Sequence, residues 1–112
     1  MKKIELEGRW SEYILEALPC DCGEIIASSV NDGFQGECSY LIRLATGNYA
    51  LAEWSWGSCS YCDPYETLTD EEAKKELATC VSIMTPSEAS EYVKNVLREY
   101  PDSWLRDAGA LI

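Results

Sequence analysis

The chain has 112 residues, a length that fits one domain with its own core. Twenty acidic against nine basic residues give a net charge of −11, and a negative field of this size disfavours direct binding to nucleic acid or to an anionic membrane and favours basic protein surfaces. The opening MKKIELEG does not resemble a signal peptide, and no apolar run of about 18 residues occurs, so we expect a soluble cytoplasmic protein.

The first predicted element is a helix over residues 10–18, where apolar side chains recur at helical spacing before Pro19 ends the pattern. Three runs typical of β-strands follow at residues 24–31, 37–45 and 49–56. Asp-Gly and Gly-Asn turn signals separate them. The simplest interpretation is an antiparallel meander of about three strands.

Alternation along these runs predicts which side chains are buried. In the second run we expect one face in the core, made of Cys38, Tyr40, Ile42 and Leu44. In the third run one face carries Ala50, Ala52, Trp54 and Trp56. Two tryptophans at this spacing are more typical of core packing than of ligand stacking.

The C-terminal half is predicted to be helical. Thr69 with Glu72, and Thr85 with Glu88, have the spacing of a capping box, in which hydroxyl and carboxylate each satisfy a free backbone N–H at a helix start. Helices are therefore expected at about 70–80 and 86–100, the second with an apolar stripe of Ala89, Tyr92, Val93, Val96, Leu97 and Tyr100. The whole chain predicts a single α+β domain over residues 1–112, in which the meander is packed with two to four helices.

Four of the six cysteines form two close pairs, and they are the candidate metal ligands: Cys20, Cys22, Cys59 and Cys62. Each pair lies at a join between predicted elements beside a glycine, and zinc prefers four tetrahedral thiolates. A meander of three strands, however, sends Cys59 out at the end of the sheet opposite Cys22. Three interpretations stay open: a zinc site, unligated thiols, and disulfide or redox chemistry at Cys59 and Cys62, where a following helix would favour the thiolate.

Signs of other catalytic chemistry are scarce. Without histidine there is no Ser-His or Cys-His pair. No phosphate-binding glycine loop with its lysine occurs either. We therefore expect a protein that is not an enzyme and that carries zinc or no cofactor.

The segment WSWGSCSYCDPYE, residues 54–66, resembles small uncharacterised proteins encoded by bacteriophages and other mobile elements of bacteria. The shared pattern is an aromatic strand that runs into GSCSxCD and then a helix. It covers about a tenth of the chain and implies a phage-like context, with the cytoplasm of a host cell as the expected location, but no activity.

This context and the charge together give the leading functional hypothesis. From residue 10 to residue 66 there are nine acids and one base, Arg43. Small acidic phage proteins are often inhibitors that occupy the basic nucleic-acid channel of a host enzyme or defence complex, because carboxylates on a rigid sheet can imitate phosphates. The predicted contact residues are Glu24, Asp32, Glu37 and Glu53, with Tyr49 and Tyr61 as aromatic anchors. The alternatives are a zinc-stabilised structural or accessory protein whose acidity serves solubility, and a thiol-disulfide oxidoreductase that uses Cys59 and Cys62.

Overall fold

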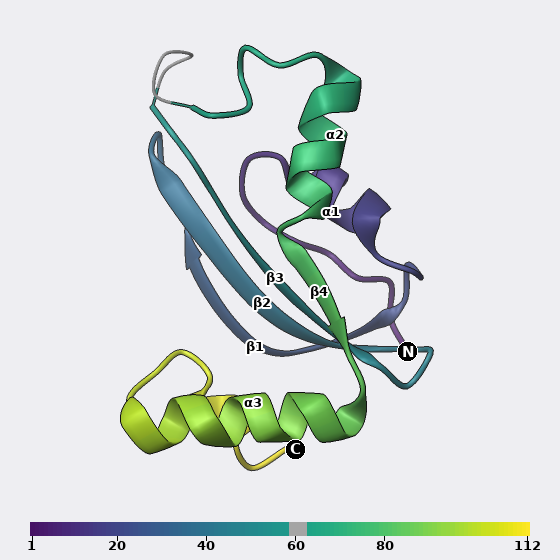
Figure 1. The fold of residues 1–112 in the computed structure, drawn as a ribbon, viewed down its shortest axis with the longest axis vertical. Coiled ribbons are helices and arrows are strands. Elements are labelled where there is room, and N and C mark those ends of the chain that lie inside the picture. The colour runs from purple at the N-terminus through teal and green to yellow at the C-terminus, as the bar shows by residue number, and fades with distance from the viewer. Residues whose placement is uncertain (59–62) are drawn as a thin grey trace.

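A computed structural model describes residues 1–58 and 63–112. In these residues four strands form one antiparallel sheet in the order β1-β2-β3-β4, with three α-helices and a 3-10 helix packed on it (Figure 1). The strands are β1 (Gly23–Asn31), β2 (Gly36–Leu44), β3 (Tyr49–Trp56) and β4 (Val81–Met84), and the helices are α1 (Ser11–Ala17), α2 (Asp70–Ala78), α3 (Pro86–Glu99) and η1 (Arg106–Ala108). The prediction of an α+β fold is confirmed.

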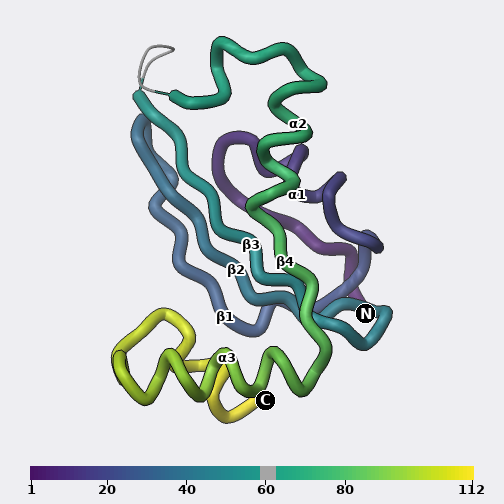
Figure 2. Tube along the Cα trace, in the orientation of Figure 1, coloured from purple at the N-terminus to yellow at the C-terminus, as the bar shows by residue number. Residues whose placement is uncertain are grey.

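The sheet has one strand more than the sequence predicts. β4 connects α2 to α3 and pairs with β3 from Tyr49↔Met84 to Ala52↔Val81. It has four residues, too few for alternation to stand out between two strongly signalled helices. Its position beside β3 continues the meander, as the trace in Figure 2 shows.

Both faces of the sheet are covered over part of their length. The predicted inner residues of β2 and β3 are buried on one face under the N-terminal segment, α1 and α2. The opposite face forms a second core around Leu41 and Tyr49, packed against Ala89 and Val93 of α3 and Leu105 near η1. Figure 1 shows that α3 crosses the lower end of the sheet, away from α1 and α2.

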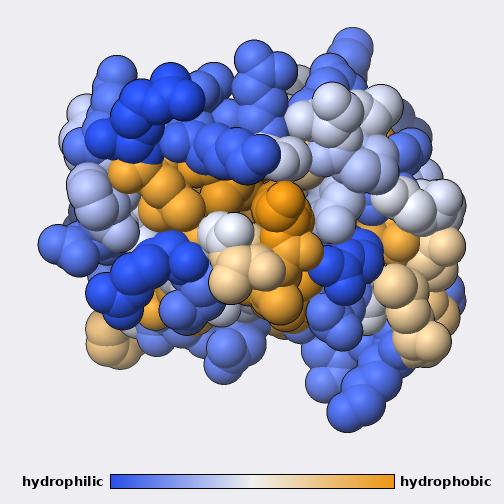
Figure 3. All heavy atoms as spheres, turned by 90° about the horizontal axis from the view of Figure 1, so that it is seen from below, coloured by the Kyte–Doolittle hydropathy of each residue, from blue (hydrophilic) through white to orange (hydrophobic). Residues whose placement is uncertain are grey.

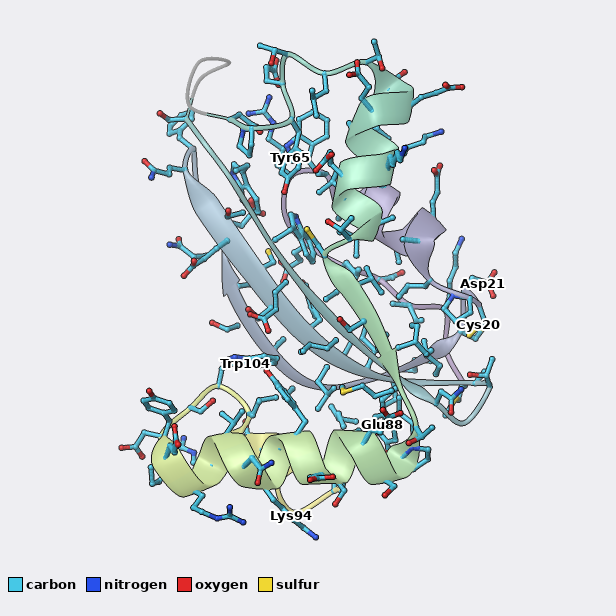
Figure 4. All side chains as sticks on the ribbon, in the orientation of Figure 1. Cys20, Asp21, Tyr65, Glu88, Lys94 and Trp104 are labelled. Carbon is cyan, nitrogen blue, oxygen red and sulfur yellow. The ribbon has the colours of Figure 1, made fainter. Side chains whose placement is uncertain are left out.

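This lower end is closed by α3 and the C-terminal loop. Seen from below, apolar side chains gather in the middle of this end between bands of hydrophilic ones (Figure 3). Trp104 lies between the C-terminal loop and the sheet, whereas Lys94 points outward from α3 (Figure 4). Tyr100 does not join the buried stripe as expected, since it caps the end of α3 and is 65% exposed.

Both predicted capping boxes are present. Thr69 Oγ1 accepts from the Glu72 N–H at 3.2 Å, and the Glu72 carboxylate accepts from the Thr69 N–H at 3.1 Å. Thr85 and Glu88 repeat this exchange at 3.2 and 3.0 Å. These reciprocal bonds define where α2 and α3 begin. In the described part of the chain, every helix is too short or too polar to span a bilayer.

Candidate functional site: an uncovered acidic sheet face and a hairpin tip

The second face of the sheet changes character halfway along its strands. Toward α3 it carries the buried Leu41, and beyond that residue it turns polar and exposed. The uncovered part is built from alternate residues of β2 and β3, namely Glu37, Ser39, Glu53 and Ser55, which we call the acidic half-face. Alternation predicts that these four side chains share one face, and the register places them side by side.

The two glutamates of the acidic half-face occupy diagonal positions on neighbouring strands. Glu37 pairs with Ser55 and Ser39 pairs with Glu53, which places the backbone positions of the two glutamates roughly 7–8 Å apart. A shallow hollow of about 220 Å³ is lined by the half-face residues. A larger one of about 590 Å³ continues past Glu37 and Ser55 to Gln35 and Pro64. Asp32 is exposed in the adjoining β1–β2 loop, which extends the negative charge to the hairpin tip.

The hairpin tip adds an apolar group that the sequence analysis did not select. Phe34 is 89% exposed, the most exposed large apolar side chain among the described residues. The loop that carries it is fixed from below, because Trp56 Nε1 donates to the Gly33 carbonyl at 2.9 Å. At Gly36 a Cβ would lie 2.2 Å from the Asn31 carbonyl oxygen, so the loop can close here only with glycine. The sequence does indicate this exposure, because Phe34 stands between Gly33 and Gly36 in a predicted turn. A turn residue belongs to neither face of a strand, so strand alternation does not place it in the core.

Some of the acids are paired with basic side chains. Salt bridges among the described residues join Arg9 to Asp63 and Glu66, Arg43 to Glu24, Lys74 to Glu16, and Arg106 to Asp102. Asp32, Glu37 and Glu53 take part in none of them. Other exposed acids, such as Glu12 and Asp21, are also outside these salt bridges. What distinguishes Asp32, Glu37 and Glu53 is therefore their common position around the half-face and the hairpin tip.

Two of the predicted contact residues, Glu24 and Tyr49, lie elsewhere. Glu24 is at the opposite end of β1, where its carboxylate is 3.4 Å from Arg43 Nη1. Tyr49 is only 7% exposed, and its hydroxyl accepts from Arg43 Nε at 3.1 Å. Because α3 covers the strand face that bears it, Tyr49 belongs to the second core, and its assignment as an exposed anchor needs correction. Tyr61 lies outside the described residues.

A second polar cluster holds the N-terminal segment against the loop after β3. The buried Asp63 carboxylate accepts from Trp10 Nε1 at 3.1 Å and from the Tyr65 N–H at 2.9 Å, and it lies 3.2 Å from Arg9 Nη1. Trp10 has a φ of +71°, a costly backbone conformation for a bulky residue. All of these polar groups have partners within the chain, so we assign this cluster a structural role.

The described cysteines show no assembled metal or redox site. Cys20 and Cys22 precede β1, with Cys20 and Asp21 in the loop at the edge of the view in Figure 4. Cys59 and Cys62 lie outside the described residues, and β3, which leads to them, ends where Trp56 pairs with Gly36, at the other end of the sheet from Cys22. In residues 1–58 and 63–112, no group of three or more histidine, cysteine or acidic side chains could hold a metal ion.

Two of the described thiols, Cys22 and Cys38, are poorly disposed to ionise. Cys20, Cys22, Cys38 and Cys80 are all free. The Cys22 thiol donates to Asp21 Oδ1 at 3.4 Å, and this hydrogen bond to a carboxylate raises the pKa of Cys22. Burial raises the pKa of Cys38 to about 11. Since a metal ligand or a nucleophile must be a thiolate, neither thiol is prepared for that chemistry.

No family model matches the chain, and comparison with curated proteins and with solved structures finds no match either. The site therefore has to be interpreted from its own geometry.

Proposed function

We propose that the chain is a non-enzymatic protein-binding module whose acidic half-face and hairpin tip occupy a basic surface of another protein. The observation that carries the proposal is that three carboxylates outside the salt bridges and a protruding aromatic ring lie together on the β1–β2 hairpin and the adjoining part of β3. Carboxylates on a fixed sheet attract a basic surface and speed association. An aromatic side chain that enters a pocket of the partner supplies the apolar anchor typical of binding hot spots.

The partner class follows from the same charges. Glu37 and Glu53 present two carboxylates on neighbouring strands of one sheet face, so the half-face offers fixed negative charges to a basic protein channel that normally binds nucleic acid. The resemblance of residues 54–66 to phage and mobile-element proteins makes an enzyme or defence complex of a bacterial host the first partner to test. In this proposal the chain inhibits that partner by excluding the nucleic acid.

The test compares two triple variants with equal change in charge. In the site variant Asp32→Asn, Glu37→Gln and Glu53→Gln remove the unneutralised acids of the site. In the control variant Glu12→Gln, Glu71→Gln and Glu91→Gln remove three exposed acids far from it.

A partner captured from host lysate with the wild-type chain is then titrated with each variant by calorimetry. We expect the site variant to bind at least about tenfold more weakly, the control variant to lose much less, and Phe34→Ser to weaken binding at unchanged charge. A nucleic acid that binds the partner should compete with the chain. Equal losses for the two triple variants would show that only net charge matters and would reject the site.

A further inference from the structure

We infer that the free edge of β1 accepts an extended, lysine- or arginine-bearing segment of the partner as a fifth strand of the sheet. This rests on the proposed function, since it states how part of a basic partner is held beside the acidic half-face. The inference is carried by an unpaired strand edge that lacks the usual protection and by the charges that border it.

Among the described residues, β1 is an outer strand of the sheet, and apart from Gly23, whose N–H donates to the Lys2 carbonyl, it pairs only with β2. Natural sheets protect such edges with lysine, proline, bulges or a covering segment. β1, GEIIASSVN, contains neither lysine nor proline. Its bulge lies between Ile25 and Ala27, and the covering bridge Lys3↔Cys22 lies at the same end. The second half, residues 28–31, is regular and exposed.

The ladder shows which backbone groups are free on this edge. In an antiparallel sheet alternate residues direct both N–H and C=O to the same neighbour. The Leu44 N–H donates to Asn48, toward β3, so even-numbered residues of β2 face β3 and odd-numbered ones face β1. Ser28 and Val30 pair with even-numbered residues of β2, and their own N–H and C=O groups therefore point outward.

The side chains beside this edge define the incoming strand. Val30 is 37% exposed on the side of the sheet that carries Cys38, and an apolar residue placed opposite it would cover it. Residues on the other side of the incoming strand would lie next to Asn31 of β1. Their backbone would be two strand spacings, about 10 Å, from the backbone of Glu37, a distance that a lysine or arginine side chain can span to reach the Glu37 carboxylate. Asp32 follows at the end of β1. The matching segment alternates apolar and basic residues.

Charge argues against a second copy of the chain as the occupant. Each copy carries −11. An antiparallel β1–β1 pairing centred on Ser28 would also bring Glu24 of each copy near Asp32 of the other, and like charges across strands are destabilising. A basic segment relieves this repulsion, and β-strand addition gains affinity from main-chain hydrogen bonds and specificity from alternate side chains.

The test uses the peptide (Lys-Val)4 with blocked termini as the probe. A valine opposite Val30 directs its N–H and C=O to β1, so N-methylation of every valine amide removes the N–H donors that face β1, whereas N-methylation of every lysine amide removes the donors on the far edge. The two methylated peptides have identical charge and composition. We expect methylation at valine to weaken binding at least about tenfold and methylation at lysine to change it little. Hydrogen exchange should slow at the Ser28 and Val30 amides on binding of the unmodified peptide.

A Val30→Pro variant removes one outward N–H without breaking the ladder to β2 and should bind the peptide more weakly. If both methylated peptides bind equally and no amide of residues 28–31 gains protection, strand addition is wrong, while the acidic site, judged by its own charge variants, is untouched. A wild-type dimer that Val30→Pro converts to monomer would assign the edge to a second copy and overturn the inference.

Discussion

Replacement of Asp63 by alanine tests whether the fold depends on the buried polar cluster after β3. Its carboxylate is fully buried and satisfies the indole N–H of Trp10 and the backbone N–H of Tyr65, while Arg9 lies beside it with 39% of its side chain exposed. Asp63→Ala leaves these two part-buried donors without their partner. Each such donor costs about 1–3 kcal/mol. Arg9 can be rehydrated and adds little.

The expected loss of unfolding free energy is therefore about 2–6 kcal/mol for Asp63→Ala. For a domain of this size each kcal/mol lowers the melting temperature by roughly 4 °C, so a decrease of about 8–24 °C should be seen by calorimetry. Asp63→Asn keeps one acceptor oxygen and should fall between wild type and alanine. Glu66→Gln is the matched control, because Glu66 also contacts Arg9 but is partly exposed, and its loss should stay below about 1 kcal/mol.

Asp63→Ala and Glu66→Gln with the same melting temperature, within about 2 °C, would refute this reasoning. Such a result would mean that Trp10 and Tyr65 find water when the carboxylate is removed. The left-handed conformation of Trp10 would then need another explanation, since its indole bond to Asp63 is what holds that residue against the loop.

Two further predictions concern protonation. The backbone N–H groups at the helix starts lower the pKa of Glu72 and Glu88 in the folded state. Each capping box therefore stabilises the fold above roughly pH 4.5 and loses this contribution as the pH falls through the lowered pKa. Glu88→Gln should flatten the decrease in melting temperature from about pH 5 to about pH 3, and an unchanged slope would contradict a stabilising role of the box. Cys38 is buried and its pKa is raised to about 11, so its thiol should resist iodoacetamide at neutral pH until denaturant is added. The more accessible Cys20 should react before it. Labelling is followed by mass spectrometry, and rapid labelling of Cys38 in the native protein would contradict its burial.

Local chemistry explains what the sequence could predict. The capping boxes at Thr69 and Thr85 need only residues three positions apart, and they define the starts of α2 and α3 in both the prediction and the structure. Strict alternation in β2 likewise predicted the buried face that contains Tyr40 and Ile42. These signals are short-range, so no knowledge of the tertiary arrangement was required.

The errors come from the placement of α3, which is a tertiary choice. Periodicity predicted that this helix has an apolar stripe but not which sheet face it covers. Once α3 lies over Leu41, the neighbouring Tyr49 becomes buried on the same face, and its role changes from exposed anchor to core residue. Phe34 is the converse case, because a turn carries it to the tip of a hairpin where no element covers it.

The half-coverage of this face has a physical cause that connects the fold to the proposed function. A helix over the far half of the sheet would have to remove water from Glu37 and Glu53. The free-energy cost of burying unpaired carboxylates is far larger than the gain from burying the small apolar area around Ser39 and Ser55. α3 instead packs where Leu41 offers apolar surface. The same cost selects among partners: a surface that covers the acidic half-face must bring its own cations, because the chain places no lysine or arginine in β1 or in the first half of β2. Exclusion of the protein's own helix and, in the proposed function, the preference for a basic partner would thus both follow from one pair of charges.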